Sequence, residues 1–144
     1  MKRTSLVVVS LLALTFVWAG LVSASPTIEI RADIPFAFSV NNQVLPAGSY
    51  EIIKDDNTSM LRIRNEATRR STIFAVNTPF WRTVSAPTAK LKFNRYGDQY
   101  FLSVISTYDS TQNVRNTKSE REAARQASRN LAMEGPEVIE VTGQ

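Results

Sequence analysis

Apolar and polar residues alternate along much of the chain between residues 28 and 108. Ile34, Phe36, Phe38 and Val40 alternate with smaller or polar residues, which is typical of a β-strand with one buried face. The same period predicts further strands at 49–54, 60–64, 69–76, 88–93 and 99–108. Short strands at this spacing predict a mainly β fold, either an antiparallel β-sandwich or a small β-barrel of about 6–8 strands.

Turn residues separate the predicted strands. Asn41 and Asn42 form one turn signal, and the run from Pro46 to Gly48 forms a second, because proline fixes its own φ and glycine tolerates positive φ. A hairpin loop is expected in "NRYGD", where Gly97 can adopt a left-handed conformation. The stretch "IPFAFSVNNQVLPAGSYEI" carries no reactive chemistry, so we interpret it as a hairpin that serves as scaffold.

The period of the pattern changes after residue 116. Residues 117–134 favour a helix, because Ala, Arg, Glu and Leu have high helix propensity. Thr117 and Glu120 fit a capping box, and Gly135 fits the position just past the helix end. The apolar stripe is narrow and mostly alanine, so the helix is expected to dock shallowly or to project. Residues 135–144 are expected to form a tail or a short edge strand.

The first residues are typical of a secretory signal peptide. A short basic start precedes a long apolar run, which ends in the small-residue pattern "VSA". We expect cleavage between Ala24 and Ser25, a β domain at 25–116, and export to the periplasm or the medium. The alternative is an uncleaved membrane anchor, since the run is nearly long enough to span a bilayer. No later run could span a membrane, so the cleaved chain is expected to have no membrane span.

Charge and residue types exclude several functions. The 144 residues include 17 Lys and Arg against 13 Asp and Glu, with no His and no Cys. Lys2 and Arg3 precede the cleavage site, so the remaining basic excess is too small for a nucleic-acid-binding domain. Without His or Cys, the chain cannot build the usual nucleophilic triads and lacks the preferred zinc and copper ligands. We expect no metal, no other cofactor and no enzymatic activity.

The loop "PFWRT", residues 79–83, is the first candidate binding site for a ligand or partner. Phe80 and Trp81 offer flat apolar surface beside the charge of Arg82. Such a set can stack on a sugar, a base or another protein. The alternative is that both rings fold back and cap one end of the core.

A second candidate is a cationic patch on the third and fourth predicted strands. It consists of Arg62, Arg64, Arg69 and Arg70. If these strands pair, the arginines can share a face and bind acidic envelope polymers. The alternative is an ordinary solvated sheet face, with Glu66 nearby.

The predicted helix carries a further basic stripe, Arg121, Arg125 and Arg129. This stripe could lie on an anionic surface. Helices that bind membrane surfaces have large apolar residues opposite the charge, whereas here those residues are mostly alanine. A solvated helix, or one packed on a partner, fits this composition better.

Four motifs resemble those of a group of small exported bacterial β proteins, of the kind abundant in acidobacteria. The motifs are "IPFAF", "LPAGSYEI", "LKFNRYGDQYFL" and "KSEREAAR", at residues 34–38, 45–52, 91–102 and 118–125. The resemblance covers most of the mature chain. It implies an exported β protein and brings no activity, because the matching residues are turns and core positions.

The sequence therefore predicts a non-catalytic exported protein that binds an unknown envelope protein or polymer. One alternative is a small β-barrel that carries an apolar ligand, since many aromatic residues are predicted to face inward. A less favoured alternative is a carboxylate-based hydrolase. Asp55 and Asp56 are adjacent in a turn and are expected to point apart, whereas glycosidase chemistry needs two carboxyl groups facing across a cleft.

Overall fold

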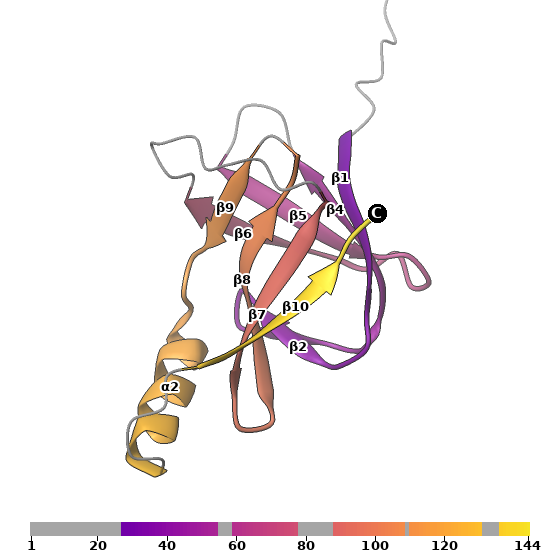
Figure 1. The fold of residues 1–144 in the computed structure, drawn as a ribbon. Coiled ribbons are helices and arrows are strands. Elements are labelled where there is room, and N and C mark those ends of the chain that lie inside the picture. The colour runs from indigo at the N-terminus through magenta and orange to yellow at the C-terminus, as the bar shows by residue number, and fades with distance from the viewer. Residues whose placement is uncertain (1–26, 55–58, 78–87, 109, 131–135) are drawn as a thin grey trace, which may run out of the picture.

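The computed structural model describes residues 27–54, 59–77, 88–108, 110–130 and 136–144. These residues form ten strands and one helix: β1 (Thr27–Ile34), β2 (Phe38–Val40), β3 (Gln43–Leu45), β4 (Gly48–Lys54), β5 (Met60–Asn65), β6 (Ser71–Asn77), β7 (Lys90–Tyr96), β8 (Gln99–Ser106), β9 (Thr111–Val114), α2 (Lys118–Asn130) and β10 (Glu137–Thr142). The predicted mainly β fold with one helix near the C-terminus is confirmed (Figure 1). The predicted signal peptide and the loop 79–83 lie outside the described residues.

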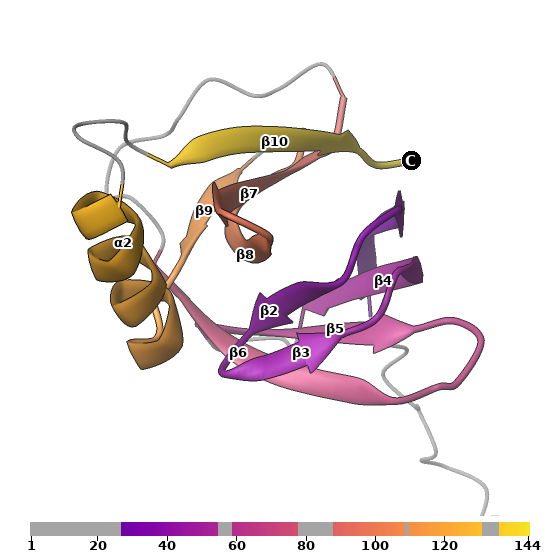
Figure 2. The same cartoon turned by 90° about the horizontal axis from the view of Figure 1, so that it is seen from below.

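The strands form one mixed sheet that curls into a barrel-like shape (Figure 2). Antiparallel pairing connects the strands in the order β1, β4, β5, β6, β9, β8, β7 and β10. The two ends of this path meet. The Arg31 amide donates to the Gln144 carbonyl at 3.1 Å, and the Gln144 amide donates to the Arg31 carbonyl at 2.8 Å. We call this contact between β1 and the residues after β10 the seam.

The stretch at 34–52 contains two hairpins rather than the predicted single one. The outer pairing joins β1 to β4, with Ile34 opposite Gly48. The inner pairing joins β2 to β3, and β2 also meets β8 in parallel through Ser39 and Phe101. The inner hairpin follows Pro35, which cannot donate a ladder hydrogen bond. The predicted strand that includes Ile34 and Val40 is therefore split at Pro35.

Positive φ angles confirm two predicted turns. Asn41 and Asn42 have φ of 49° and 62° in the two-residue loop between β2 and β3. A two-residue loop with both φ angles positive matches the twist of the flanking strands, and Asn tolerates this conformation. Gly97, with φ of 61°, turns the chain between β7 and β8.

The core lies between the two sides of the curled sheet and is rich in aromatic rings. Phe36 stacks on Tyr100 at 4.1 Å between ring centroids and meets the edge of Phe93 at 5.2 Å. Phe38 lies 5.2 Å from Tyr50 and 5.4 Å from Phe93, again edge to face. These arrangements are the favoured ones for aromatic pairs. The residues predicted to face inward from the first strands are therefore core residues.

Helix α2 forms half of the predicted capping box. The Thr117 hydroxyl accepts a hydrogen bond from the Glu120 amide at 3.3 Å, as an N-cap should. The Glu120 carboxylate does not complete the box. It turns toward the sheet and accepts a hydrogen bond from Asn94 Nδ2 on β7 at 2.9 Å. The described helix ends at Asn130, and residues 131–135 lie outside the described residues.

Candidate binding site at the seam

A buried carboxylate organises the outer face of the sheet near the seam. Glu51 on β4 lies opposite Arg31 of β1 and Arg64 of β5. Its carboxylate accepts hydrogen bonds from Arg31 Nη2 at 3.2 Å and from Arg64 Nε at 2.9 Å, and Arg64 Nη2 makes a further bond. Glu51 is only 5% exposed, and the two guanidinium groups offset the free-energy cost of burying its charge. We call Arg31, Glu51 and Arg64 the charge triad.

The triad lowers the pKa of Glu51 below its ordinary value of 4.5. The largest cause is the hydrogen bond from Arg64. Burial opposes it by raising the pKa, and the positive charges of Arg64 and Arg31 lower it further. The carboxylate is therefore ionised across the neutral pH range, and it holds β1, β4 and β5 in fixed register.

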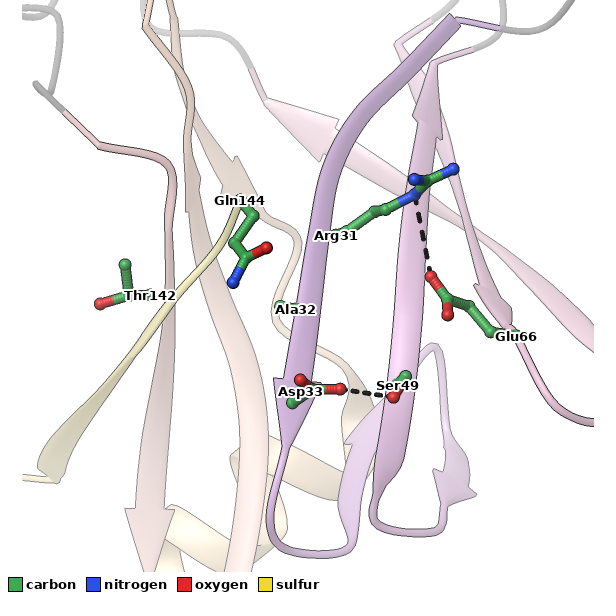
Figure 3. Close-up of a pocket in the computed structure, with 7 residues that line it drawn as sticks. All are labelled: Arg31, Ala32, Asp33, Ser49, Glu66, Thr142 and Gln144. Carbon is green, nitrogen blue, oxygen red and sulfur yellow. Dashed lines mark hydrogen bonds and ion pairs between the residues drawn. The ribbon is translucent and has the colours of Figure 1, made fainter.

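A hollow of about 350 Å³ lies beside the triad, where the seam closes the sheet (Figure 3). Its lining comes from β1, from β4, from the turn after β5 and from the residues around the end of β10. The lining residues are Arg31, Ala32, Asp33, Ser49, Glu66, Thr142 and Gln144. We call this feature the seam hollow. Its walls exist only because segments from both ends of the described chain meet there.

Hydrogen bonds position several of the lining side chains. The Ser49 hydroxyl donates to the Asp33 carboxylate, and Arg31 Nε lies 3.8 Å from Glu66 Oε1 (Figure 3). Glu66 is fixed through its backbone as well, because its amide donates to the Ser49 carbonyl at 3.0 Å. Arg31 thus belongs to both the triad and the hollow, so the triad fixes one wall of the hollow.

The seam hollow offers both donors and acceptors, with a slight excess of negative charge. The lining includes two carboxylates, Asp33 and Glu66, and one guanidinium, that of Arg31. Asp33 takes part in no ion pair between described residues, so its remaining acceptor positions are open to a ligand. Within the described residues no group of three or more Asp and Glu side chains is arranged to hold a metal ion.

The predicted cationic patch divides into two parts in the structure. Arg62 and Arg64 are two residues apart on β5 and project from the same face of the sheet. Arg64 is bound to Glu51, so its charge is partly compensated. Arg69 and Arg70 lie in the exposed turn before β6, where Arg69 has a positive φ of 58°. That the four arginines act as one binding surface stays a prediction.

The other predicted binding residues, Phe80, Trp81 and Arg82, lie outside the described residues. The structure instead brings together residues that the sequence pattern did not single out. In the sequence pattern, Asp33 and Ser49 are only polar positions in segments that alternate. Thr142 and Gln144 belong to the predicted tail or edge strand. No local signal could identify them, because the hollow depends on the pairing of Arg31 with Gln144.

Comparisons with known proteins add no identification: no family model, curated protein or solved structure matches this chain. In the part of the chain that the structure describes, the single helix is too short and too polar to cross a bilayer.

Proposed function

We propose that the protein is a non-catalytic exported module that binds a hydroxyl-rich polymer of the cell envelope in the seam hollow. The observation that carries this proposal is the hollow itself, a polar depression of about 350 Å³ with fixed walls. This volume lies near the lower end of the range typical of small-molecule sites, roughly 300–1,000 Å³. It suits one or two sugar units of a longer chain.

The chemistry of the lining supports a hydroxyl-rich ligand. A sugar hydroxyl both donates and accepts, so it can bridge a carboxylate and a neighbouring amide or guanidinium. Asp33 and Glu66 supply acceptors, while Arg31 and Gln144 supply donors. Hydrogen bonds to charged groups are the stronger ones, and they contribute roughly 1.5–3 kcal/mol each.

Export is part of the proposal and is supported by the N-terminal sequence. The basic start, the apolar run and the "VSA" ending together are typical of a cleaved signal peptide. The absence of His and Cys from the whole sequence supports a binding role over nucleophilic catalysis. The contacts of Phe36 with Phe93 and Tyr100 favour a surface site over an apolar ligand held among these rings.

The test is a titration of isotope-labelled protein, followed by NMR, with soluble peptidoglycan fragments and with a neutral glucan oligosaccharide. We expect saturable chemical-shift changes in β1, β4 and the residues after β10. Asp33→Asn should weaken binding about tenfold, because it removes one charged acceptor. Asp98→Asn, the same change in the exposed turn after β7, is the matched control and should have no effect.

Other outcomes would contradict the proposal. Chemical-shift changes confined to other surfaces would place the binding site elsewhere. If neither probe binds, a hydroxyl-rich ligand is excluded. Cleavage of a bound oligosaccharide, detected by mass spectrometry of the recovered sugar, would instead favour the hydrolase alternative, with Asp33 and Glu66 as its carboxylates.

A further inference from the structure

Helix α2 separates its residues into two opposite faces. The face toward the sheet consists of buried or half-buried residues, namely Glu120, Ala123, Ala124 and Ala127. The opposite face carries four exposed cations, Lys118, Arg121, Arg125 and Arg129. At 100° per residue these four positions fall within an arc of about 80°, so their side chains form one stripe. We call this surface the basic stripe.

The charges of the basic stripe are largely uncompensated. Lys118 lies 3.8 Å from Glu122 in an exposed i,i+4 pair, which is a weak interaction. Arg121, Arg125 and Arg129 take part in no ion pair between described residues. The other acid of the helix, Glu120, is 3% exposed and is bound to Asn94 on the sheet side. Its carboxylate is therefore directed away from the stripe.

The helix is attached so that the basic stripe stays accessible. In both ribbon views α2 lies beside the sheet rather than across it (Figures 1 and 2). Its side-chain hydrogen bonds to the sheet region come from its first turn: Glu120 accepts from Asn94 on β7, and the Ser119 hydroxyl donates to Asn42 Oδ1 in the loop between β2 and β3 at 2.9 Å. Ala123 is buried, whereas the arginines of the stripe are exposed to solvent.

We propose that the basic stripe binds a linear polymer that carries phosphate groups. Guanidinium groups match phosphate oxygens with two parallel hydrogen bonds, which a row of arginines can repeat along a chain. A membrane surface fits less well, because a helix that lies on lipid needs large apolar residues beside its charges. The residues that flank the stripe are Glu122 and Gln126 on one side and Ala124 and Ser128 on the other, and none of them is large and apolar. This binding is separate from the hydroxyl-rich ligand of the seam hollow.

The experiment uses the purified protein and fluorescently labelled, long-chain inorganic polyphosphate, with binding followed by anisotropy. The variant Arg121→Gln with Arg125→Gln keeps helix propensity while it removes two charges. The matched control, Lys90→Gln with Lys92→Gln, makes the same change in net charge on β7, at residues that belong to no candidate binding site. We expect the helix variant to bind about tenfold more weakly and the control to bind as the wild type does.

Circular dichroism of both variants shows whether the helix content is preserved. Three results would overturn the proposal: no binding of polyphosphate, equal loss in both variants, or loss confined to the control. Equal loss would mean that net charge alone attracts the polymer. Vesicles of phosphatidylcholine with phosphatidylglycerol form a separate arm, and binding to these vesicles without binding to polyphosphate would also overturn it in favour of a membrane surface.

Discussion

The charge triad and the basic stripe use the same side chain in opposite ways. On the sheet, Arg31 and Arg64 converge on one buried carboxylate, so their charges are partly compensated and they link three strands. On the helix, Arg121 and Arg125 face solvent and contribute no such link. The position of the acid decides the difference. Glu51 faces the arginines of its own surface, whereas Glu120 turns to the opposite side of its helix.

Removing the central acid should produce the largest effect. Glu51→Ala leaves two guanidinium groups without their shared partner, and breaking a buried pair costs about 3–5 kcal/mol. The side chains of Arg31 and Arg64 are 60% and 28% exposed, and solvent screens part of this cost. We expect the free energy of unfolding to fall by about 2–3 kcal/mol in urea titrations. An unchanged midpoint would mean that the triad contributes no stability.

The seam can be opened without touching any charge. A Cβ on Gly143 would overlap Cγ2 of Ile30, a fully buried core residue, and would lie 3.2 Å from the Arg31 carbonyl. Gly143→Ala should therefore cost about 1–3 kcal/mol and shift Thr142 and Gln144 away from β1. Ligand binding in the seam hollow should weaken, while polyphosphate binding by the helix should not change. Equal loss of both activities would indicate general unfolding instead.

Acid should affect the triad before it affects the basic stripe. Because the pKa of Glu51 is lowered in the folded protein, its stabilising contribution is complete above the unfolded pKa and is lost as pH falls through the folded pKa. Stability should therefore decline below about pH 4.5, and Glu51→Gln should flatten that decline. The pKa of Glu140 is also lowered, first by its hydrogen bonds to Lys92 and Lys90, so Glu140→Gln is the control for an exposed ion pair.

Loss of the helix cap should affect α2 and leave the sheet unchanged. Thr117→Ala removes the acceptor for the Glu120 amide, which costs about 1 kcal/mol. Hydrogen exchange should accelerate in the first turn of α2 and stay unchanged in β4 and β5. Thr117→Ser keeps the acceptor and should behave as the wild type. Faster exchange in the strands would show that the helix stabilises the sheet.

The smallest expected effect concerns a tyrosine next to the helix. Burial raises the pKa of Tyr96 above 10.0, and the negative charge of Glu120 raises it further. Glu120→Gln should bring the pKa of Tyr96 closer to its ordinary value, as measured by the ultraviolet absorbance of tyrosinate during an alkaline titration. An unchanged titration would mean that the Glu120 carboxylate does not face β7. Glu122→Gln, on an exposed position of the same helix, is the control.

Local features could be predicted from the sequence because few alternatives exist for them. Asn41, Asn42 and Gly97 adopt positive φ because their types tolerate it, and Thr117 caps the helix because its side chain reaches the first turn. The period of two placed the inward residues of β4, β5 and β7 correctly, whereas Ile73, expected at the buried end of β6, is exposed. These features depend on neighbours within a few residues along the chain.

Features that depend on distant segments could not be predicted. Strand β9, "TQNV", is short and mostly polar, and it becomes a strand because β8 and β6 supply partners on both sides. Glu120 fits a capping box by spacing, yet Asn94 offers its carboxylate a partner on the sheet. No sequence motif marks the seam hollow, because the residues on its two sides are separated in the sequence by nearly the whole described chain.

The pairing of Arg31 with Gln144 also bears on the folding rate. The hairpins β4–β5, β5–β6 and β7–β8 join neighbouring segments, so each can form early at a small cost in loop entropy. The contact between β1 and the residues after β10 closes the longest loop, and contacts of this kind slow folding. We expect closure of the sheet to be a late step. The seam, and with it the seam hollow, would then stay open until residues 136–144 are available to pair beside β1.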